Sequence, residues 1–306
     1  MQNTELQRVS TVFCILPSEL VSMLTPTTLD SYMRRAAALT HQTVEMPPFE
    51  LFFDPHDPLR FYNYARPVGP IGEAPSVGVG SGPSTSSGSG PSTGSGSALD
   101  GVLAALREAF ETRHRLPRFE FVAEATPGLP AVLQAVGFVE EGRNPLLVCT
   151  AETFRPAADV PGLAVVTLTT DSPVADLCAA GTTQARSFGA EDAPEMTEAE
   201  GERQRARLVA GAGGFLARLD GVAVAAADFT VPLDGFTELV GIATLPAYRR
   251  RGIAAALTAR AVTEAFARGV RVAFLGAEDE RAGRVYERVG FRPFATALAY
   301  SAAQGV

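Results

Sequence analysis

The residues whose types and spacing most clearly suggest a binding site are three arginines and a glycine, Arg249 to Gly252, in the stretch LPAYRRRGIAAAL. They follow an apolar segment and precede an apolar run with helical spacing. The first N–H groups of a helix have no intrahelical partner, and the helix dipole adds partial positive charge there. A glycine lets such amides approach a ligand, and arginines add forked, permanent charge. The pattern predicts a phosphate or pyrophosphate site; the alternative is a solvated helix start.

The distribution of charge supports a site for one small anion. Residues 249–306 hold ten arginines and five acidic residues, although the whole chain carries a net charge of −8. The turn lacks the Gly-x-x-x-x-Gly-Lys pattern of a Walker A loop and the Gly-x-Gly-x-x-Gly pattern of dinucleotide-binding folds. A nucleic-acid surface is the remaining alternative, but an acidic chain whose longest basic run is three residues predicts no nucleic-acid partner.

A strand, a tight turn and a helix must position this site. The stretch FTELVGIATL (236–245) is almost continuously apolar, which is typical of a central strand. The helix after Gly252 keeps Ile253, Leu257, Ala261 and Ala265 on one face and stops at Gly269. The second half of the chain also predicts strands at 163–169, at 213–230 as a pair turned around Asp220-Gly221, at 270–277 and at 290–301, and helices that begin near 171 and 197 and span 279–289. This alternation favours an α/β or α+β fold with a mixed sheet.

The two halves of the chain carry a faint repeat. FEFVA (119–123) and VAFLG (272–276) stand 153 residues apart, and at the same offset AVLQAVGF (131–138) corresponds to RVYERVGF (284–291). Chance similarity of Ala/Val-rich segments is the alternative, but preserved order and spacing favour a duplication. We therefore predict domains at 1–155 and 160–306. A Gly/Ser tract at 76–97 would be a disordered insertion in the first domain.

At this point the sequence resembles a known family. RRRGIA (249–254) resembles the acyl-CoA signature of the GNAT N-acetyltransferase superfamily, Gln/Arg-x-x-Gly-x-Gly/Ala. DERAGRVYERVGF (279–291) resembles its second motif, Asn-x-x-Ala-x-x-x-Tyr-Glu-x-x-Gly-Phe. The resemblance covers roughly 163–301. It implies two tandem GNAT-like domains, each a mixed β-sheet with flanking helices, of which the N-terminal copy is degenerate.

Carried over residue by residue, the resemblance implies a site for acetyl-CoA and two catalytic residues. Tyr286 would stand near the thioester sulfur as general acid, and Glu238 would occupy the position of the general base. The pantetheine arm of CoA would pair with the edge of strand 236–245 like an added strand. The residues implied to bind CoA are Ile242, Ala243 and Thr244 on that strand, Arg249, Arg250, Arg251, Gly252, Ile253 and Ala254 at the turn, and Asp279 at the second motif.

Elementary chemistry agrees with these roles. An amine is almost wholly protonated at pH 7, so it needs a base before it can attack. Burial beside Leu239 and Val240 would raise the pKa of Glu238 into a useful range. A surface strand acid and a core aromatic are the alternatives for Glu238 and Tyr286. The sequence departs from the family pattern at Ala254, where glycine is commoner, and at Asp279, where asparagine is usual.

The first copy lacks both motifs. Leu133 stands where Tyr286 would be, and the Gly/Ser tract occupies the place of the arginine-glycine turn. We therefore expect a non-catalytic first domain that helps to shape the acceptor cleft. The resulting prediction is an acetyl-CoA-dependent N-acetyltransferase acting by direct transfer, with a small-molecule or peptide amine as acceptor. The alternative is a non-catalytic acyl-CoA-binding or regulatory module.

Other residues predict no further chemistry. The histidines His41, His56 and His114 all lie in the first half, so the second half cannot build a Ser-His-Asp triad from its own residues, and we expect no metal site. Three separated cysteines predict neither a disulfide framework nor a zinc site. The sequence shows neither a signal peptide nor an apolar run long enough for a membrane span. We expect a cytoplasmic protein without a membrane partner, either a monomer that is a pseudo-dimer of two domains or a homodimer.

Overall fold

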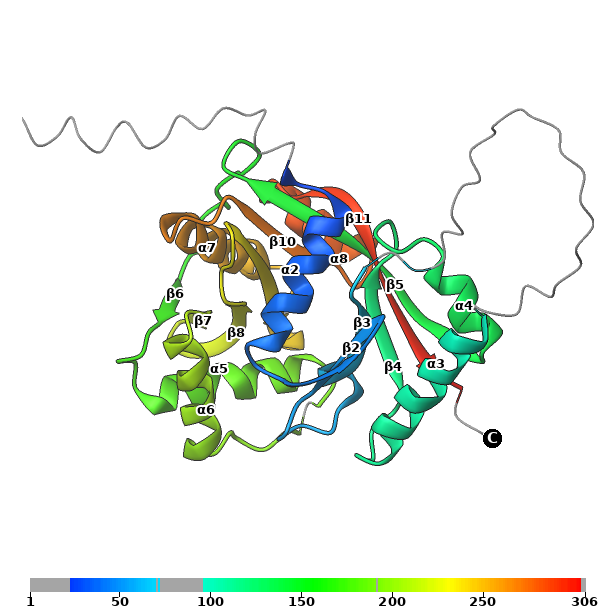
Figure 1. Cartoon of the computed structure of the whole chain (residues 1–306). Coiled ribbons are helices and arrows are strands. Elements are labelled where there is room, and N and C mark those ends of the chain that lie inside the picture. Colours follow the sequence, from blue (N-terminus) through cyan, green and yellow to red (C-terminus); the bar gives the residue numbers. More distant parts are fainter. Residues whose placement is uncertain (1–22, 70, 72–95, 191, 304–306) are drawn as a thin grey trace, which may run out of the picture.

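The computed structural model describes residues 23–69, 71, 96–190 and 192–303 of the 306-residue chain. The insertion predicted at 76–97 lies outside these residues, except that residues 96 and 97 begin the helix α3. Helices and strands alternate along most of the chain (Figure 1). The helices are α2 (Pro26–Ala38), α3 (Gly96–Glu111), α4 (Leu129–Ala135), α5 (Val174–Ser187), α6 (Glu198–Val209), α7 (Ile253–Ala267) and α8 (Glu280–Arg288), with 3-10 turns η1 (Arg60–Tyr62) and η2 (Pro246–Tyr248).

The described strands form one mixed sheet in the order β1-β2-β3-β4-β11-β5-β10-β9-β8-β7-β6. The strands are β1 (Gln42–Met46), β2 (Phe49–Phe53), β3 (Asn63–Pro67), β4 (Arg118–Val122), β5 (Phe138–Thr150), β6 (Leu163–Leu168), β7 (Gly213–Leu219), β8 (Val222–Phe229), β9 (Phe236–Thr244), β10 (Val272–Gly276) and β11 (Arg292–Ala302). The predicted mixed sheet with flanking helices is therefore confirmed.

The order of the strands is symmetric about the pair β5 and β11. From one side it runs β1-β2-β3-β4-β11, and from the other, inside the additional edge strand β6, it runs β7-β8-β9-β10-β5. In both halves the third and fourth strands are parallel and a long helix, α3 or α7, connects them. Each half thus gives its last strand to the other half: β5 pairs with β10, and β11 pairs with β4. The predicted division at 155–160 stays a prediction, because strands of the two halves alternate at the centre of the sheet.

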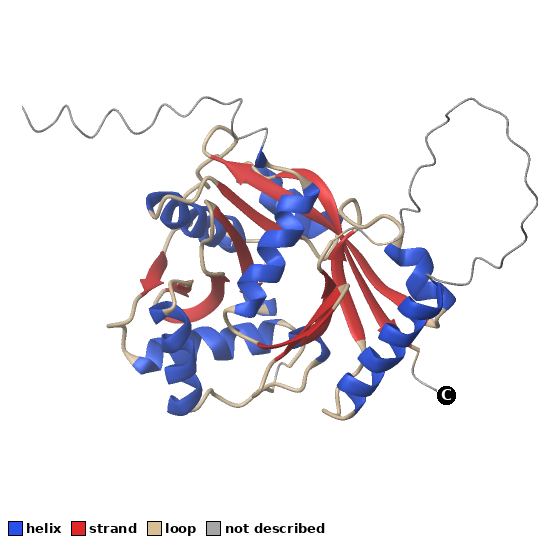
Figure 2. Ribbon diagram, viewed as in Figure 1, coloured by secondary structure: helices blue, strands red, loops and turns tan. Residues whose placement is uncertain are grey.

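Helices cover both faces of the sheet (Figure 2). On one face α3 and α4 pack over the first half, and α7 and α8 pack over the second. On the other face α2 contributes Leu29 and Tyr32 to a cluster with Phe236 and Phe274, and α5 covers β7 and β8. We call the first the α7 face and the second the α2 face.

Local sequence signals explain several element boundaries. Thr197 and Glu200 form the capping box predicted for α6, in which the side chain of each residue accepts a hydrogen bond from the backbone N–H of the other. Asp220 and Gly221 both have positive φ, as the tight turn between β7 and β8 requires. Asp279 begins α8 by accepting a hydrogen bond from the Ala282 N–H at 2.7 Å.

Candidate functional site

The two central strands β9 and β10 separate at Glu238. Their parallel pairing runs from Phe236 opposite Val272 to Glu238 opposite Phe274, and β9 then continues to Thr244 beside β8 alone. The edge of β9 that faces β10 is therefore unpaired from Leu239 onward in the described structure. An unpaired strand edge can accept an extended ligand as an additional strand.

A bulge at Gly241 accompanies this separation. The register of β9 against β8 shifts between the pairs Val240–Asp228 and Ala243–Ala226, and Gly241 has φ +61°. A Cβ atom on Gly241 would lie 2.4 Å from Nε2 of Gln184, which donates a hydrogen bond to the Gly241 carbonyl at 3.0 Å. Only glycine fits here without displacing Gln184. Such bulges bend a strand and increase its twist, so this one helps β9 to turn away from β10.

The unpaired part of β9 carries the three residues predicted to bind the pantetheine arm. Ala243 is buried, and Ile242 and Thr244 are half-buried. The Oγ1 atom of Thr244 is buried and has no hydrogen-bond partner among the described residues. A buried hydroxyl without a partner is uncommon, and a polar ligand lying along β9 would satisfy it.

The arginine-glycine turn presents free backbone amides from Arg250 onward, whereas the Arg249 N–H, which the sequence interpretation included, donates to the Pro246 carbonyl at 3.3 Å. After η2, Arg250 and Gly252 have φ +65° and +83°, and α7 begins at Ile253. The first hydrogen bond that involves α7 is donated by the Ala256 N–H to the Gly252 carbonyl. In the described structure no hydrogen bond is donated by the amides of residues 250–255, so six successive N–H groups are available to an anion.

The three arginine side chains of this turn have different surroundings. Arg249 donates from Nε to the Thr244 carbonyl at 3.0 Å and from Nη2 to the Ser187 carbonyl at 2.9 Å. It therefore fastens the turn to the end of β9 and to the last turn of α5. Arg251 lies over the Tyr248 ring at 5.4 Å, and both Arg250 and Arg251 are exposed. The sequence pattern required Arg249, and its hydrogen bonds give a physical reason.

Asp279 has a local structural contact. Its carboxylate caps α8, as described above, which occupies one of its oxygens with the Ala282 N–H. The contact between Asp279 and the CoA arm that the resemblance implies stays a prediction. Ile253, the first residue of α7, is buried, whereas the next residue, Ala254, is half-buried beside the free amides.

Glu238 lies on the α2 face of β9, at the point where the strands separate. Side chains alternate along a strand, and the next residue, Leu239, belongs to the cluster beneath α7 and α8. The Glu238 carboxylate accepts no hydrogen bond from any described residue. Burial raises its pKa to about 7, while Arg66 lowers the pKa and Glu120 raises it. A carboxylate with this pKa is suited to take a proton from a substrate near neutral pH.

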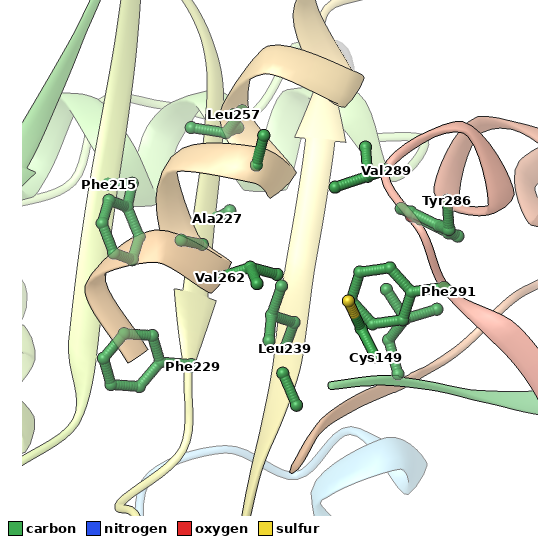
Figure 3. Packing of buried hydrophobic residues seen from close by; sticks show 14 of the residues in the cluster. Cys149, Phe215, Ala227, Phe229, Leu239, Leu257, Val262, Tyr286, Val289 and Phe291 are labelled. Carbon is green, nitrogen blue, oxygen red and sulfur yellow. The ribbon is translucent and has the colours of Figure 1, made fainter. Parts of the chain in front are cut away.

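Tyr286 lies on the α7 face, in the same buried cluster as Leu239 (Figure 3). Its ring packs edge-on against Phe291, with 6.2 Å between ring centroids. Its hydroxyl makes no hydrogen bond to the described residues. Burial, with a smaller contribution from Glu278, raises the pKa of Tyr286 to about 12, so the hydroxyl stays protonated across the working pH range.

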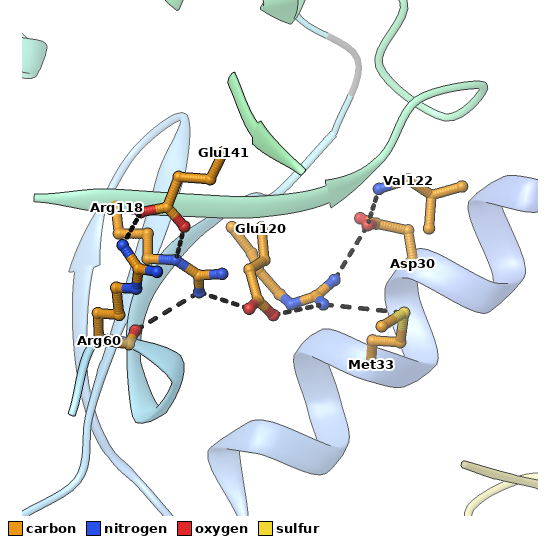
Figure 4. A network of polar contacts seen from close by, with 8 residues as sticks. Asp30, Met33, Arg60, Arg118, Glu120, Val122 and Glu141 are labelled. Atoms are coloured by element: carbon orange, nitrogen blue, oxygen red, sulfur yellow. Dashed lines mark hydrogen bonds and ion pairs between the residues drawn. The ribbon is translucent and has the colours of Figure 1, made fainter. Parts of the chain in front are cut away.

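The sequence interpretation missed a group of charged residues in the first half. Arg66 on β3 and Glu120 on β4 lie on the α2 face and are close enough to Glu238 to change its pKa. They belong to a chain of ion pairs, drawn in Figure 4, in which three arginines and three acids alternate without surplus charge. This ion-pair chain consists of Asp30, Arg66, Glu120, Arg118, Glu141 and Arg60. Tyr64 on β3 also lies near Glu238.

A weak signal for this group was present in the sequence. RFEFV places Arg118 and Glu120 at alternate positions beside buried phenylalanines, and NYARP places Tyr64 and Arg66 on either side of the buried Ala65. Such alternation is normally interpreted as a strand with one solvated face. Here that face looks toward Glu238, which sequence spacing could not indicate.

The described residues contain no group of three or more His, Cys, Asp or Glu side chains that could hold a metal ion. Within the same residues, no helix combines the length and the apolar character that a membrane crossing requires.

Comparison with known proteins finds a family match within the second half of the chain. Residues 182–291 match the acetyltransferase (GNAT) family. This segment runs from within α5 to the residue before β11, so it contains Glu238, the arginine-glycine turn and Tyr286. No curated protein matches the chain.

Solved structures extend the likeness to both halves. A GCN5-related N-acetyltransferase from Kribbella flavida is 25% identical, with a TM-score of 0.69, over 92% of this chain and 97% of that chain. A tandem GNAT protein from the clavulanic acid biosynthesis pathway has the same fold over 84% of this chain and 79% of its own, with 15% identity and a TM-score of 0.56. Another GCN5-related N-acetyltransferase, from Sphaerobacter thermophilus, covers 68% of this chain and 69% of its own at 18% identity and a TM-score of 0.52. Residues 182–291 are therefore similar to the acetyltransferase (GNAT) family, and the fold of the described chain is similar to that of tandem GNAT structures.

Proposed function

We propose that the protein is an acetyl-CoA-dependent N-acetyltransferase that transfers the acetyl group directly to an amine. The observation that carries this proposal is the separation of β9 and β10 at Glu238, between a potential base on one face and a turn of free amides at the far end of β9. The family match supports the reaction class, and the geometry supports the assignment of residues.

The residues of the turn and of β9 fit acetyl-CoA. The free amides of residues 250–255 would hold the pyrophosphate, because they combine unpaired donors with the positive end of α7. The unpaired edge at Ile242, Ala243 and Thr244 would hold the pantetheine arm, and its amide groups would satisfy the Thr244 hydroxyl. When bound, acetyl-CoA supplies the thioester whose acetyl group is transferred.

Glu238 would act as the general base. The acceptor arrives as an ammonium ion and must lose a proton before its nitrogen can attack. Glu238 has no ion-pair partner among the described residues, whereas the neighbouring acids Asp30, Glu120 and Glu141 are each paired with an arginine. Accepting the proton therefore leaves no uncompensated charge on the α2 face, which favours the transfer.

Tyr286 would assist departure of the CoA sulfur from the α7 face. Its pKa of about 12 is well above that of a thiol, about 8.5 in model peptides, so complete proton transfer is uphill. A hydrogen bond from the hydroxyl to the sulfur, as negative charge builds on it, is the contribution that this pKa allows. The role of general acid implied by the resemblance is thereby narrowed to that of a hydrogen-bond donor.

The first half would be non-catalytic. Leu133 occupies the place that corresponds to Tyr286 and is fully buried beneath the α7 face. The acceptor would be a small-molecule amine that enters on the α2 face, where residues of both halves meet. A peptide amine is the alternative acceptor.

The proposal is tested by incubating the purified protein with acetyl-CoA and a mixed library of amines. We expect release of free CoA thiol and one or a few acetylated products in the mass spectrum. Tight binding of acetyl-CoA, with no free CoA thiol released in the presence of any amine, would instead favour an acyl-CoA-binding or regulatory module. Absence of acetyl-CoA binding would refute both functions.

A further inference from the structure

Helix α2 of the first half is hydrogen-bonded to the loop after β8, and a residue of this loop is in turn hydrogen-bonded to Glu238 on β9. The Tyr32 hydroxyl lies 2.6 Å from Oγ1 of Thr230 and donates to the Val231 carbonyl at 2.9 Å. The same Thr230 Oγ1 accepts a hydrogen bond from the Glu238 N–H at 3.0 Å. Tyr32 is 3% exposed, and its ring packs edge-on against Phe274, which pairs with Glu238 across the last bonded step of β9 and β10. Tyr32 is therefore two hydrogen bonds away from the Glu238 backbone.

Asp30, on the same helix, is bonded to strands β3 and β4 of the first half. Asp30 accepts a hydrogen bond from the Val122 N–H of β4 at 3.0 Å and pairs with Nη1 of Arg66 at 3.2 Å. The second terminal nitrogen of Arg66 lies 3.7 Å from Glu120. Asp30 and Tyr32 are separated by a single residue, so a short rigid segment joins the strand of Glu238 to the strands of Arg66 and Glu120.

We propose that the first half is a working part of the acceptor site: Tyr32 and Asp30 fix the spacing across α2, and Arg66 and Glu120 act as positioning residues for the amine at Glu238. This inference rests on the proposed function. It gives the degenerate copy a definite task, which is to set the environment of the base in the other copy.

The charges around Glu238 support this arrangement. Among the described residues, Arg66 and Glu120 are the charged groups that act on its pKa, and the phenols of Tyr32 and Tyr64 are titratable groups nearby. Both phenols have pKa values raised by burial, so they stay neutral near pH 7. Arg66 favours the ionised form of Glu238 and Glu120 opposes it, which means that the first half adjusts the pH at which the base becomes active.

Two carboxylates that share one arginine provide a matched test. Glu120 and Glu141 both pair with Arg118, but of the two only Glu120 acts on the pKa of Glu238. We expect Glu120→Gln to move the acidic limb of kcat/KM for the amine downward by about half to one pH unit, because a negative neighbour is lost and Arg66 gains influence. Glu141→Gln should leave the limb in place. Equal profiles for the two variants would overturn the proposal.

Two buried tyrosines test the hydrogen-bonded path in the same way. Tyr32→Phe keeps the ring against Phe274 and removes the bond to Thr230, so we expect KM for the amine to rise several-fold while the dissociation constant of acetyl-CoA stays unchanged. Tyr300→Phe is the control, since Tyr300 is equally buried and its hydroxyl bonds Glu140 at 2.8 Å, on the α7 face. The same change in KM for both variants would mean that Tyr32 has a purely structural role.

A titration that needs no turnover separates this inference from the proposed function. With 13C-labelled glutamate, the Glu238 carboxyl signal, assigned by its loss in Glu238→Gln, should titrate at lower pH in Glu120→Gln and at the wild-type pH in Glu141→Gln. A protein that acetylates no amine yet shows this difference refutes the proposed function and keeps the coupling. An acetylating protein without the difference refutes the coupling alone.

Discussion

Glu238 and Tyr286 lie on opposite faces of the sheet, at the place where β9 and β10 separate. Leu239, the neighbour of Glu238 on β9, shares a buried cluster with Tyr286, whereas Glu238 faces α2 and the strands of the first half. In the proposed reaction the amine loses its proton on one face and the sulfur departs on the other. In this reaction the acetyl group would pass from the CoA sulfur to the amine nitrogen at the gap between the two strands.

Removing the base should abolish most of the activity and its pH dependence. Wild-type kcat/KM should rise with pH through about 7, because Glu238 acts only when it is ionised. Glu238→Gln should lower kcat by about 10²- to 10⁴-fold and remove this acidic limb, with acetyl-CoA affinity unchanged. Steady-state kinetics between pH 5.5 and 9, together with calorimetric binding of acetyl-CoA, would check this. A limb that persists in the variant would assign it to another group.

The same residue should make stability depend on pH. The folded protein keeps the Glu238 proton up to about pH 7, whereas the unfolded chain loses it near the ordinary glutamate value of 4.5. Between these values the unfolded state binds fewer protons, so the free energy of unfolding falls as the pH rises. Glu238→Gln lacks this loss, and its melting temperature relative to wild type should be higher at pH 8 than at pH 5. A constant difference would show that the carboxyl is not perturbed.

The Tyr286 hydroxyl should contribute to the rate and leave binding unaffected. Tyr286→Phe keeps the packing against Phe291 and removes one donor, so we expect kcat to fall by about 10²-fold with unchanged acetyl-CoA affinity. Because the pKa of Tyr286 is about 12, the shape of the pH profile below pH 9 should match that of the wild type. An alkaline limb that vanished in this variant would contradict the raised pKa.

Two glycines at opposite ends of α7 test the anion site. Gly252 and Gly269 have φ +83° and +85°, so aspartate at either position bears a similar backbone strain. Gly252→Asp places a negative charge among the free amides, and the dissociation constant of acetyl-CoA should rise more than about tenfold, which is 1.4 kcal/mol. Gly269→Asp should bind as wild type does. Normal affinity in Gly252→Asp would refute the placement of the pyrophosphate.

The bulge in β9 can be tested against the turn between β7 and β8. A Cβ at Gly241 would meet Gln184 at 2.4 Å, whereas a Cβ at Gly221, with a similar positive φ of +85°, meets nothing within 4 Å. Gly241→Ala should therefore be less stable than Gly221→Ala by about 1–3 kcal/mol, and only the former should weaken acetyl-CoA binding. Chemical denaturation and binding calorimetry of both variants would decide the matter.

Many elements could be predicted because their signals are local. The capping box at Thr197, the turn at Asp220-Gly221 and the glycine that ends α7 each act within a few residues, and the structure has the elements that they predict. The mixed sheet and the free amides before α7 follow from the same kind of reasoning. The arginine-glycine turn was therefore visible in the sequence alone.

The exchange of the last strands could not be predicted in this way. β5 and β11 follow similar helices and similar Val-Gly-Phe turns, so local sequence does not say which of them pairs with β4 and which with β10. The neighbours of Glu238 were hidden for a related reason. Arg66 and Glu120 lie far from Glu238 along the chain, and they meet it only because α2 and the shared sheet bring the halves together.

The position of β11 has a consequence for the synthesis of this protein. β4 is bonded along its length to β11, the last of the described strands, and has one bridged pair with β3 among the described residues. A ribosome therefore completes the first half well before the strand that closes its sheet has been made. Until residues 292–302 have been synthesised, β4 and β5 lack the strand that pairs with them, and unpaired strand edges of this kind favour aggregation.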